Sequence, residues 1–216
     1  MLSLQKRFLF IHVPKTGGNS IQTVLKAYSE DKVTAKAGHQ DGNERFEVRN
    51  DALALRKHAS LGQYKAALDP DIYASLFKTA VMRNPWDMMI SHYFSPHRGE
   101  REWNRDDFIK LVRHTPVLRH YIKENTLRDK ISVKLQTLTG SPGRSLDADI
   151  DFLLKVESLD EDFKTLCGKL DIPYTPLPQR NASTRTHYTE YYDQETMRLV
   201  QRKFREEIDF GGYCFG

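Results

Sequence analysis

The feature that most constrains this chain is the segment of residues 8–25, which reads FLFIHVPKTGGNSIQTVL. Its first part is an apolar, β-rich run that ends at Pro14, and such a run predicts a buried strand. The second part places Ile21, Val24 and Leu25 at helical spacing. A strand, a Gly-Gly turn and a helix in this order open an α/β unit of the nucleotide-binding type.

The turn between this strand and this helix has the composition of an anion-binding site. Gly17 and Gly18 allow successive backbone N–H groups to point into one concavity. The helix adds its unpaired N-terminal N–H groups and the positive end of its dipole. Side chains that can bind an anion come from Lys15, Thr16, Asn19 and Ser20. The turn therefore predicts a phosphate or sulfate site, and a purely structural turn is the alternative.

The order of residues in the turn differs from the Walker A pattern. In that pattern the lysine follows the glycines, and a hydroxyl group binds magnesium. Here Lys15 precedes Gly17, and no clear acidic metal ligand follows a second strand. Cys167 and Cys214 form no metal-ligand pattern, and no His/Cys/Asp cluster has zinc spacing. We therefore expect an anion site that functions without a metal.

A second basic segment, KTAVMRNPWDMMISHY, occupies residues 78–93. It places Arg83 at the carboxyl end of a predicted strand, and Ser91 lies on the helix that begins with Pro85. An arginine fork and a hydroxyl group suit a second phosphate. A surface ion pair is the alternative role for Arg83.

Together the two segments resemble the nucleotide-binding motifs of sulfotransferases, in particular the branch with carbohydrate O-sulfotransferases and their bacterial relatives. The donor in that family is 3′-phosphoadenosine 5′-phosphosulfate. The resemblance implies that Arg83 and Ser91 bind the 3′-phosphate. It implies that the 5′-phosphosulfate is bound by Lys15, Thr16, Gly17, Gly18, Asn19 and Ser20. One departure is Met88, where relatives commonly have a basic residue.

A third segment, LPQRNASTR at residues 177–185, resembles a nucleotide-side loop of the same family that usually reads L-x-x-x-N-x-S-x-R. This resemblance implies that Ser183 and Arg185 also bind the donor. Tyr191-Tyr192 and a DFGGY segment follow, so the resemblance touches most of the chain.

Sulfuryl transfer needs stabilisation of charge at the bridging oxygen and a base for the acceptor hydroxyl. Lys15 is the natural candidate for the first role. Of the eight histidines, His58 lies between the two donor segments, where relatives place a histidine base. His39 and His97 are the next candidates, and a structural role is the alternative for each histidine.

The order of the predicted elements indicates the fold class. Strands at residues 7–13, 77–82 and 152–156 alternate with helices. This order predicts an α/β, P-loop-like three-layer fold, with a central parallel sheet that is flanked by helices and binds ligands at the carboxyl ends of its strands. We expect one sulfotransferase domain over residues 1–216, in which residues 95–145 form a helical region on the acceptor side.

Other segments carry simpler predictions. Residues 32–49 are polar and predict a loop, and residues 51–57 predict a short helix. Ser158, with Glu161 three residues later, predicts a capping box. Helices are expected at residues 19–28, 68–74, 86–94, 104–113, 117–124, 158–170 and 189–208, and a loop at residues 139–144.

The composition of the chain limits the kinds of partner that we expect it to bind. The formal charge of +4 suits an anionic small ligand, and the chain lacks the aromatic–basic motif of a nucleic-acid binder. No apolar run approaches the roughly 20 residues of a membrane helix. The N-terminus enters a strand at once and leaves no room for a signal peptide, so a cytoplasmic location is expected. Five arginines within residues 95–145 suit either an anionic sugar or solvated helix faces: Arg98, Arg101, Arg105, Arg113 and Arg119.

These observations predict a sulfotransferase that moves a sulfuryl group in line from its donor to a hydroxyl group of a small molecule or glycan, and more specifically a carbohydrate. A phosphotransferase on the same scaffold is one alternative, and it calls for magnesium and a Walker-type lysine. A non-catalytic module that binds a nucleotide or a sulfated glycan is another. Such a module would keep the phosphate-binding segments but would not need Lys15 and His58 as a reactive pair.

Overall fold

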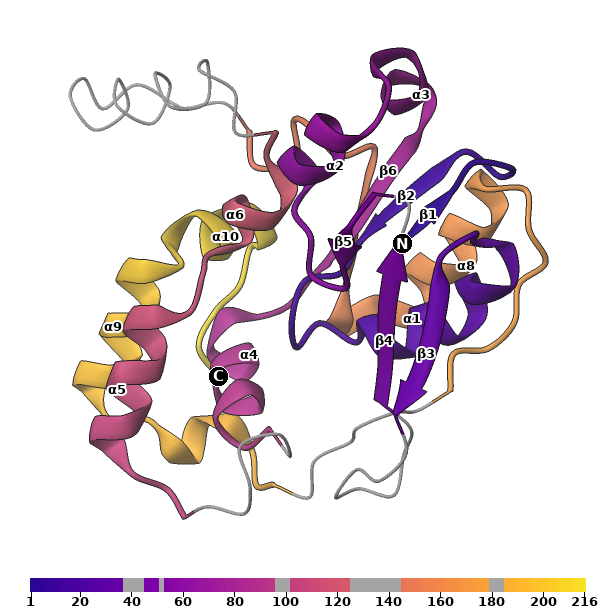
Figure 1. Cartoon of the computed structure of the whole chain (residues 1–216). Coiled ribbons are helices and arrows are strands. Elements are labelled where there is room, and N and C mark those ends of the chain that lie inside the picture. The colour runs from indigo at the N-terminus through magenta and orange to yellow at the C-terminus, as the bar shows by residue number, and fades with distance from the viewer. Residues whose placement is uncertain (37–44, 51–52, 96–101, 125–144, 179–184) are drawn as a thin grey trace.

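The computed structural model describes residues 1–36, 45–50, 53–95, 102–124, 145–178 and 185–216. A four-stranded sheet lies between helices in the order β1–β2–β6–β7 (Figure 1). Its strands are β1 (Leu2–Ser3), β2 (Phe8–Ile11), β6 (Phe77–Met82) and β7 (Phe152–Lys155). β2, β6 and β7 run parallel, and β1 pairs antiparallel with β2. The predicted α/β fold, with a parallel sheet flanked by helices, is confirmed, with one antiparallel edge strand in addition.

Helices cover both faces of this sheet. One face packs against α1 (Gly18–Leu25) and α8 (Leu159–Lys169). The other face packs against α2 (Leu61–Ala67), α3 (Pro70–Ser75) and α6 (Leu118–Ile122). The three layers of the prediction are thus helices, sheet and helices.

The side chains of β2 show how the sequence produces these layers. Successive side chains of a strand point to opposite faces of its sheet. Phe8 and Phe10 are buried in the core with α1 and α8, whereas Leu9 and Ile11 are buried in the core with α2 and α6. Because both faces are covered, the strand reads as an unbroken apolar run.

A further group of helices lies beside the sheet, on the left of Figure 1. It consists of α4 (Pro85–Tyr93), α5 (Arg105–His114), α9 (Gln194–Lys203) and α10 (Arg205–Gly211). Trp86, Tyr93 and Phe108 lie in its core. Short 3₁₀ turns occur at Lys26–Tyr28, Val156–Ser158 and Tyr188–Tyr191. None of the described helices combines the length and the apolar composition needed to cross a membrane.

The predicted strands at residues 7–13, 77–82 and 152–156 are confirmed as β2, β6 and β7. The predicted helices have counterparts whose ends differ by a few residues, except that the helical region expected at residues 189–208 is divided into a 3₁₀ turn, α9 and α10, and the helix expected at residues 51–57 is absent. Helix α2 was missed. Its signal is a capping box, in which Ser60 Oγ accepts from the N–H of Gln63 and Gln63 Oε1 accepts from the N–H of Ser60. The predicted loop at residues 139–144 lies outside the described residues.

The prediction of a loop over residues 32–49 is wrong. β3 (Lys32–Lys36) pairs antiparallel with β4 (Arg45–Asn50). The short helix expected at residues 51–57 is also wrong, because β5 (Leu55–Arg56) adds a third strand to this small sheet. The polar composition of this segment does not exclude a strand, since polar and apolar residues alternate in KVTAK with the period of a strand.

The capping box predicted at Ser158 is wrong as well. The side chain of Ser158 makes no cap bond, and its Oγ donates to Oδ2 of Asp162 at 2.9 Å. The same carboxylate oxygen accepts from the N–H of Lys155 at 2.8 Å. Asp162 thus joins the end of β7 to the first turn of α8, and Ser158 satisfies this carboxylate instead of the helix N-terminus.

Candidate functional site

The turn between β2 and α1 presents backbone N–H groups at the carboxyl end of the sheet. Lys15 (φ 67°) and Gly17 (φ 74°) both have left-handed backbone conformations. Such residues let neighbouring N–H groups converge on one concavity. α1 begins after Gly17 without a side-chain cap and without an acidic residue in its first turn, in which Ser20 is buried. The positive end of the helix dipole therefore faces the turn, as an anion site requires.

The two glycines of the turn are required for different reasons. Gly17 has a left-handed conformation that side chains disfavour, and a Cβ there would lie 3.0 Å from Leu159. Gly18 is in close contact with His12, because a Cβ at position 18 would lie 2.2 Å from Cδ2 of that ring. The close approach of His12 thus excludes a side chain at position 18.

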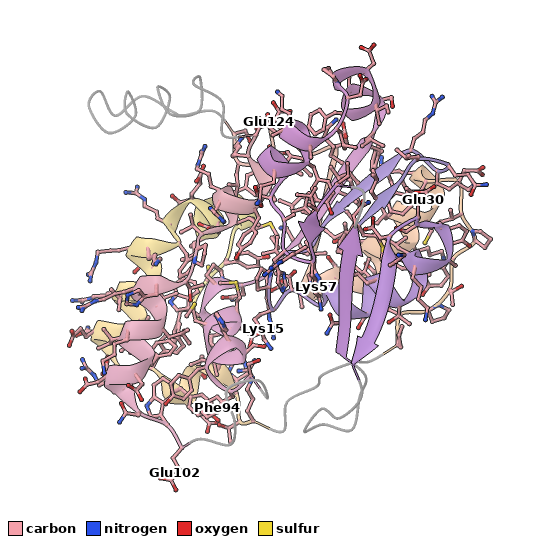
Figure 2. All side chains as sticks on the ribbon, viewed as in Figure 1. Lys15, Glu30, Lys57, Phe94, Glu102 and Glu124 are labelled. Atoms are coloured by element: carbon pink, nitrogen blue, oxygen red, sulfur yellow. The ribbon has the colours of Figure 1, made fainter. Side chains whose placement is uncertain are left out.

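The side chains of the turn have separate partners. Thr16 is buried, and its hydroxyl donates to a backbone carbonyl of the preceding strand end at 2.9 Å, which braces the turn. Asn19 Oδ1 accepts from Nζ of Lys57 at 2.5 Å. Nζ of Lys15 lies 3.4 Å from Oγ of Ser95, just after α4. In the view of Figure 2, both lysines lie between α4 and the β3–β4 hairpin.

Two histidines pack beside the turn. His12 is 5% exposed, and burial, together with the nearby charges of Lys57 and His58, holds its pKa well below the usual range. The ring of His58 is exposed and lies 4.8 Å from that of His12, centroid to centroid.

The hydrogen bond of His58 determines its tautomer. Nδ1 of His58 lies 3.0 Å from the backbone carbonyl oxygen of His12. A carbonyl oxygen only accepts, so Nδ1 of His58 carries the proton. In the neutral ring the lone pair is then on Nε2, which is the form that a general base needs.

Asp87 joins the second predicted segment to the third. Its Oδ2 accepts from Nε of Arg83 at 2.7 Å, and its Oδ1 accepts from Nη2 of Arg185. Burial alone would raise the pKa of Asp87, but the charges and hydrogen bonds of the two arginines lower it below its ordinary value. Nη1 of Arg83 also donates to the carbonyl of Lys15 at 2.9 Å. One carboxylate therefore orients two arginines, one of which also holds the phosphate-type turn.

The remaining predicted residues are placed as follows. Ser91 is half-buried in α4, four residues after Asp87, and residues at this spacing share one helix face. Ser183, His39 and His97 lie outside the described residues. Across the part of the chain that is described, no group of three or more His, Cys, Asp and Glu side chains is arranged to hold a metal ion.

Asp87 and Lys57 have clear contacts at the site and are absent from the predicted site residues. Asp87 stands in the RNPWD segment, and its opposite charge four residues after Arg83 is a signal that could have identified it. Lys57 has no such signal, because its contact with Asn19 joins residues from separate elements.

Two of the five arginines within residues 95–145 form ion pairs with the C-terminal helical region. Arg105 binds Asp193, with Nε and Oδ2 2.6 Å apart, and Nη2 of Arg119 binds Glu206. These contacts favour the interpretation of a solvated helix face for Arg105, whereas the side chain of Arg119 is only 17% exposed and is largely buried. Arg98 and Arg101 lie outside the described residues.

We compared the chain with known protein families, curated proteins and solved structures. The family model described as "Sulfotransferase family" matches residues 1–213. Neither the curated proteins nor the solved structures include a significant match. The matched range contains the turn, Arg83 with Asp87, and Arg185.

Proposed function

The chain belongs to the sulfotransferase family, and from this premise we propose that it moves the sulfuryl group of 3′-phosphoadenosine 5′-phosphosulfate to a hydroxyl group of a carbohydrate acceptor. The choice of donor rests on two cationic sites, one after strand β2 and one after the adjacent parallel strand β6. A hydrogen bond from Arg83 to the backbone carbonyl of Lys15 links the two sites. A donor with phosphates on both the 3′ and 5′ positions of its ribose calls for two such sites. A nucleoside triphosphate, whose phosphates form one chain, calls for one.

In this proposal the turn holds the 5′-phosphosulfate. Backbone N–H groups at Gly17, Gly18 and Asn19 face the phosphate, and Ser20 adds a hydroxyl group from the first turn of α1. Thr16 shapes the turn through its bond to the chain. Lys15 carries the charge that stabilises the bridging oxygen as the sulfuryl group departs.

The 3′-phosphate is assigned to the second site. Arg83 and Arg185 supply guanidinium groups, and Ser91 and Ser183 supply hydroxyl groups. Asp87 keeps the two guanidinium groups together and is therefore a positioning residue.

His58 is proposed as the base. Nε2 accepts the proton of the acceptor hydroxyl while the acceptor oxygen forms a bond to sulfur and the bond from sulfur to the 5′-phosphate oxygen breaks. The electron pair of that bond leaves with the phosphate, beside Lys15. The products are the sulfated acceptor and 3′-phosphoadenosine 5′-phosphate, and no metal takes part in this scheme.

The donor assignment is tested by ligand-induced stabilisation. At a hundred times its Kd, 3′-phosphoadenosine 5′-phosphate should stabilise the protein by about 2.7 kcal/mol. For a chain of this size, that corresponds to a rise in Tm of about 5–10 °C. Adenosine 5′-monophosphate, which lacks the 3′-phosphate, is the matched control and should raise the Tm less. Absence of a shift with saturating 3′-phosphoadenosine 5′-phosphate would refute the assignment.

The base is tested with His58→Asn, in which the amide can keep the hydrogen bond to the carbonyl of His12. We expect kcat to fall by about 100-fold or more, with the Kd of 3′-phosphoadenosine 5′-phosphate nearly unchanged. Turnover is measured by transfer of labelled sulfate to a panel of sugars. A wild-type kcat in this variant would exclude His58 as the base, and absence of transfer by the wild type to every sugar would favour a binding module.

A further inference from the structure

A pocket adjoins the phosphate-type turn on the side of α4, α6 and α10. Lys15, Thr16 and Arg83 form its near end. The pocket therefore begins beside Lys15, where the proposed function places the sulfuryl group, and beside Arg83, which the same proposal assigns to the 3′-phosphate. Gly17, Gly18, Asn19, Ser20 and Ser91 are described residues that do not line it, so most of the proposed phosphate contacts lie outside the pocket.

The walls beyond this near end are mainly apolar. They are formed by side chains that include Met82, Met88, Leu118, Tyr121 and Phe204. Away from the near end, the polar side chains that line the pocket are His92, Thr115 and Glu207. An apolar cavity with a few polar groups is typical of a site for a small organic ligand.

Glu207 limits the charge of that ligand. It lines the pocket from α10, is 4% exposed, and its Oε1 accepts from the N–H of Leu118 at 2.6 Å. Burial raises the pKa of this carboxyl group, and the hydrogen bond from the N–H of Leu118 opposes the shift. A carboxylate or phosphate on the ligand would meet an acidic group in a poorly hydrated place, which is unfavourable.

We propose that this pocket binds an uncharged aryl or alkyl group of the acceptor, so that the substrate is a glycoside with an apolar aglycone and not a free or anionic sugar. The inference rests on the proposed function, because only then does the mouth of the pocket face the sulfuryl group. It assigns the apolar walls to the aglycone and the turn to the donor.

The test is calorimetric titration of the wild-type protein, with and without 3′-phosphoadenosine 5′-phosphate, using three probes. Phenyl β-D-glucoside should bind at least about tenfold more tightly than methyl β-D-glucoside, because the phenyl group buries apolar surface. 4-Carboxyphenyl β-D-glucoside should lose this gain. A Kd of the phenyl glucoside no lower than that of the methyl glucoside, in both conditions, overturns the inference.

Two variants separate this inference from the donor assignment. Met88→Gln places a neutral polar side chain on a half-buried wall position and should reduce the preference for the phenyl glucoside while the Kd of 3′-phosphoadenosine 5′-phosphate changes little. Glu207→Gln keeps an acceptor for Leu118 and should restore binding of the 4-carboxyphenyl glucoside.

If Met88→Gln instead weakens binding of 3′-phosphoadenosine 5′-phosphate and leaves the phenyl preference intact, the pocket belongs to the donor and the inference fails. Failure of the proposed function has a different signature, because the wild type would then not bind 3′-phosphoadenosine 5′-phosphate at all. The glucoside titrations without nucleotide report on the pocket in either case.

Discussion

The two sites at the edge of the sheet that we propose for the phosphates are constructed differently. The turn before α1 depends on backbone geometry, with left-handed residues at Lys15 and Gly17 and an uncapped helix start. The site before α4 depends on side-chain charges, with Asp87 holding Arg83 and Arg185. The first site is therefore sensitive to backbone changes at its glycines, and the second to the loss of single charges.

One hydrogen bond connects the two sites. Arg83 donates to the carbonyl of Lys15 at 2.9 Å, so the second site also supports the backbone of the first. Lys15 is in addition the residue of the turn whose side-chain charge the proposed chemistry requires. Lys15 therefore combines a backbone role in the turn with a side-chain charge.

The largest effect should follow Lys15→Ala. Because the ammonium group is proposed to stabilise charge that develops in the transition state, kcat should fall by about 10²–10³-fold. Turnover of labelled donor measures the loss, and the melting temperature reports on the fold.

Lys15→Asn is the matched control, because asparagine tolerates the left-handed conformation of this position better than alanine. Equal losses in both variants would assign the effect to the charge. Retained turnover in either variant would remove Lys15 from the mechanism.

The next effect concerns a single charge of the second site. Arg83→Gln should weaken 3′-phosphoadenosine 5′-phosphate by about 10–100-fold, the range expected for lost charged hydrogen bonds. Adenosine 5′-monophosphate should be affected much less, since it has no 3′-phosphate. Calorimetry measures both ligands, and Arg105→Gln, which removes an exposed ion pair with Asp193, is the control. An equal loss for the two nucleotides would show that Arg83 acts only through the turn.

Backbone sensitivity is tested with Gly18→Ala. The added Cβ would lie 2.2 Å from the ring of His12, so His12 or the turn must shift. We expect unfolding to become easier by about 1–3 kcal/mol, measured by urea denaturation. Gly168→Ala is the matched control, because a Cβ there meets nothing within 4 Å and alanine favours the helix. If the two variants are equally stable, the close packing of His12 does not constrain the turn.

The central strands were predictable because burial on both faces makes them continuous apolar runs. FLFI is such a run and is followed by His-Val-Pro, whereas FKTAVM carries the signal in its last three residues, just before Arg-Asn-Pro. The β3–β4 hairpin was not predicted, because its stability depends on pairing between two polar segments and not on the composition of either. A search for alternation in addition to apolar content would have found it.

The residues of the site also divide into those that the sequence could identify and those that it could not. The turn was predictable because its functional groups are contiguous in the sequence, and a local motif specifies a local backbone. The contact of Asp87 with Arg185 joins residues 98 positions apart, and that of Lys57 with Asn19 joins residues 38 apart. Only folding brings such pairs together, so one sequence identifies the candidate residues and not their partners.

The smallest effect is the pH dependence of the second site. The two arginines hold the pKa of Asp87 below its ordinary value, so the folded state binds this proton less readily than the unfolded state does. The ion pairs therefore stabilise the protein above about pH 4, and this stabilisation disappears as the pH falls through the lower pKa of the folded state. The free energy of unfolding of the wild type should exceed that of Asp87→Asn by about 1 kcal/mol at pH 7, and the difference should shrink in urea titrations as the pH falls below about 4. Gly168→Ala removes no charge, so its difference from the wild type should stay constant over that range. If the difference in unfolding free energy between the wild type and Asp87→Asn is also constant, Asp87 stabilises the second site through its shape and not through its charge. The second site would then not depend on side-chain charge, in contrast to what we propose.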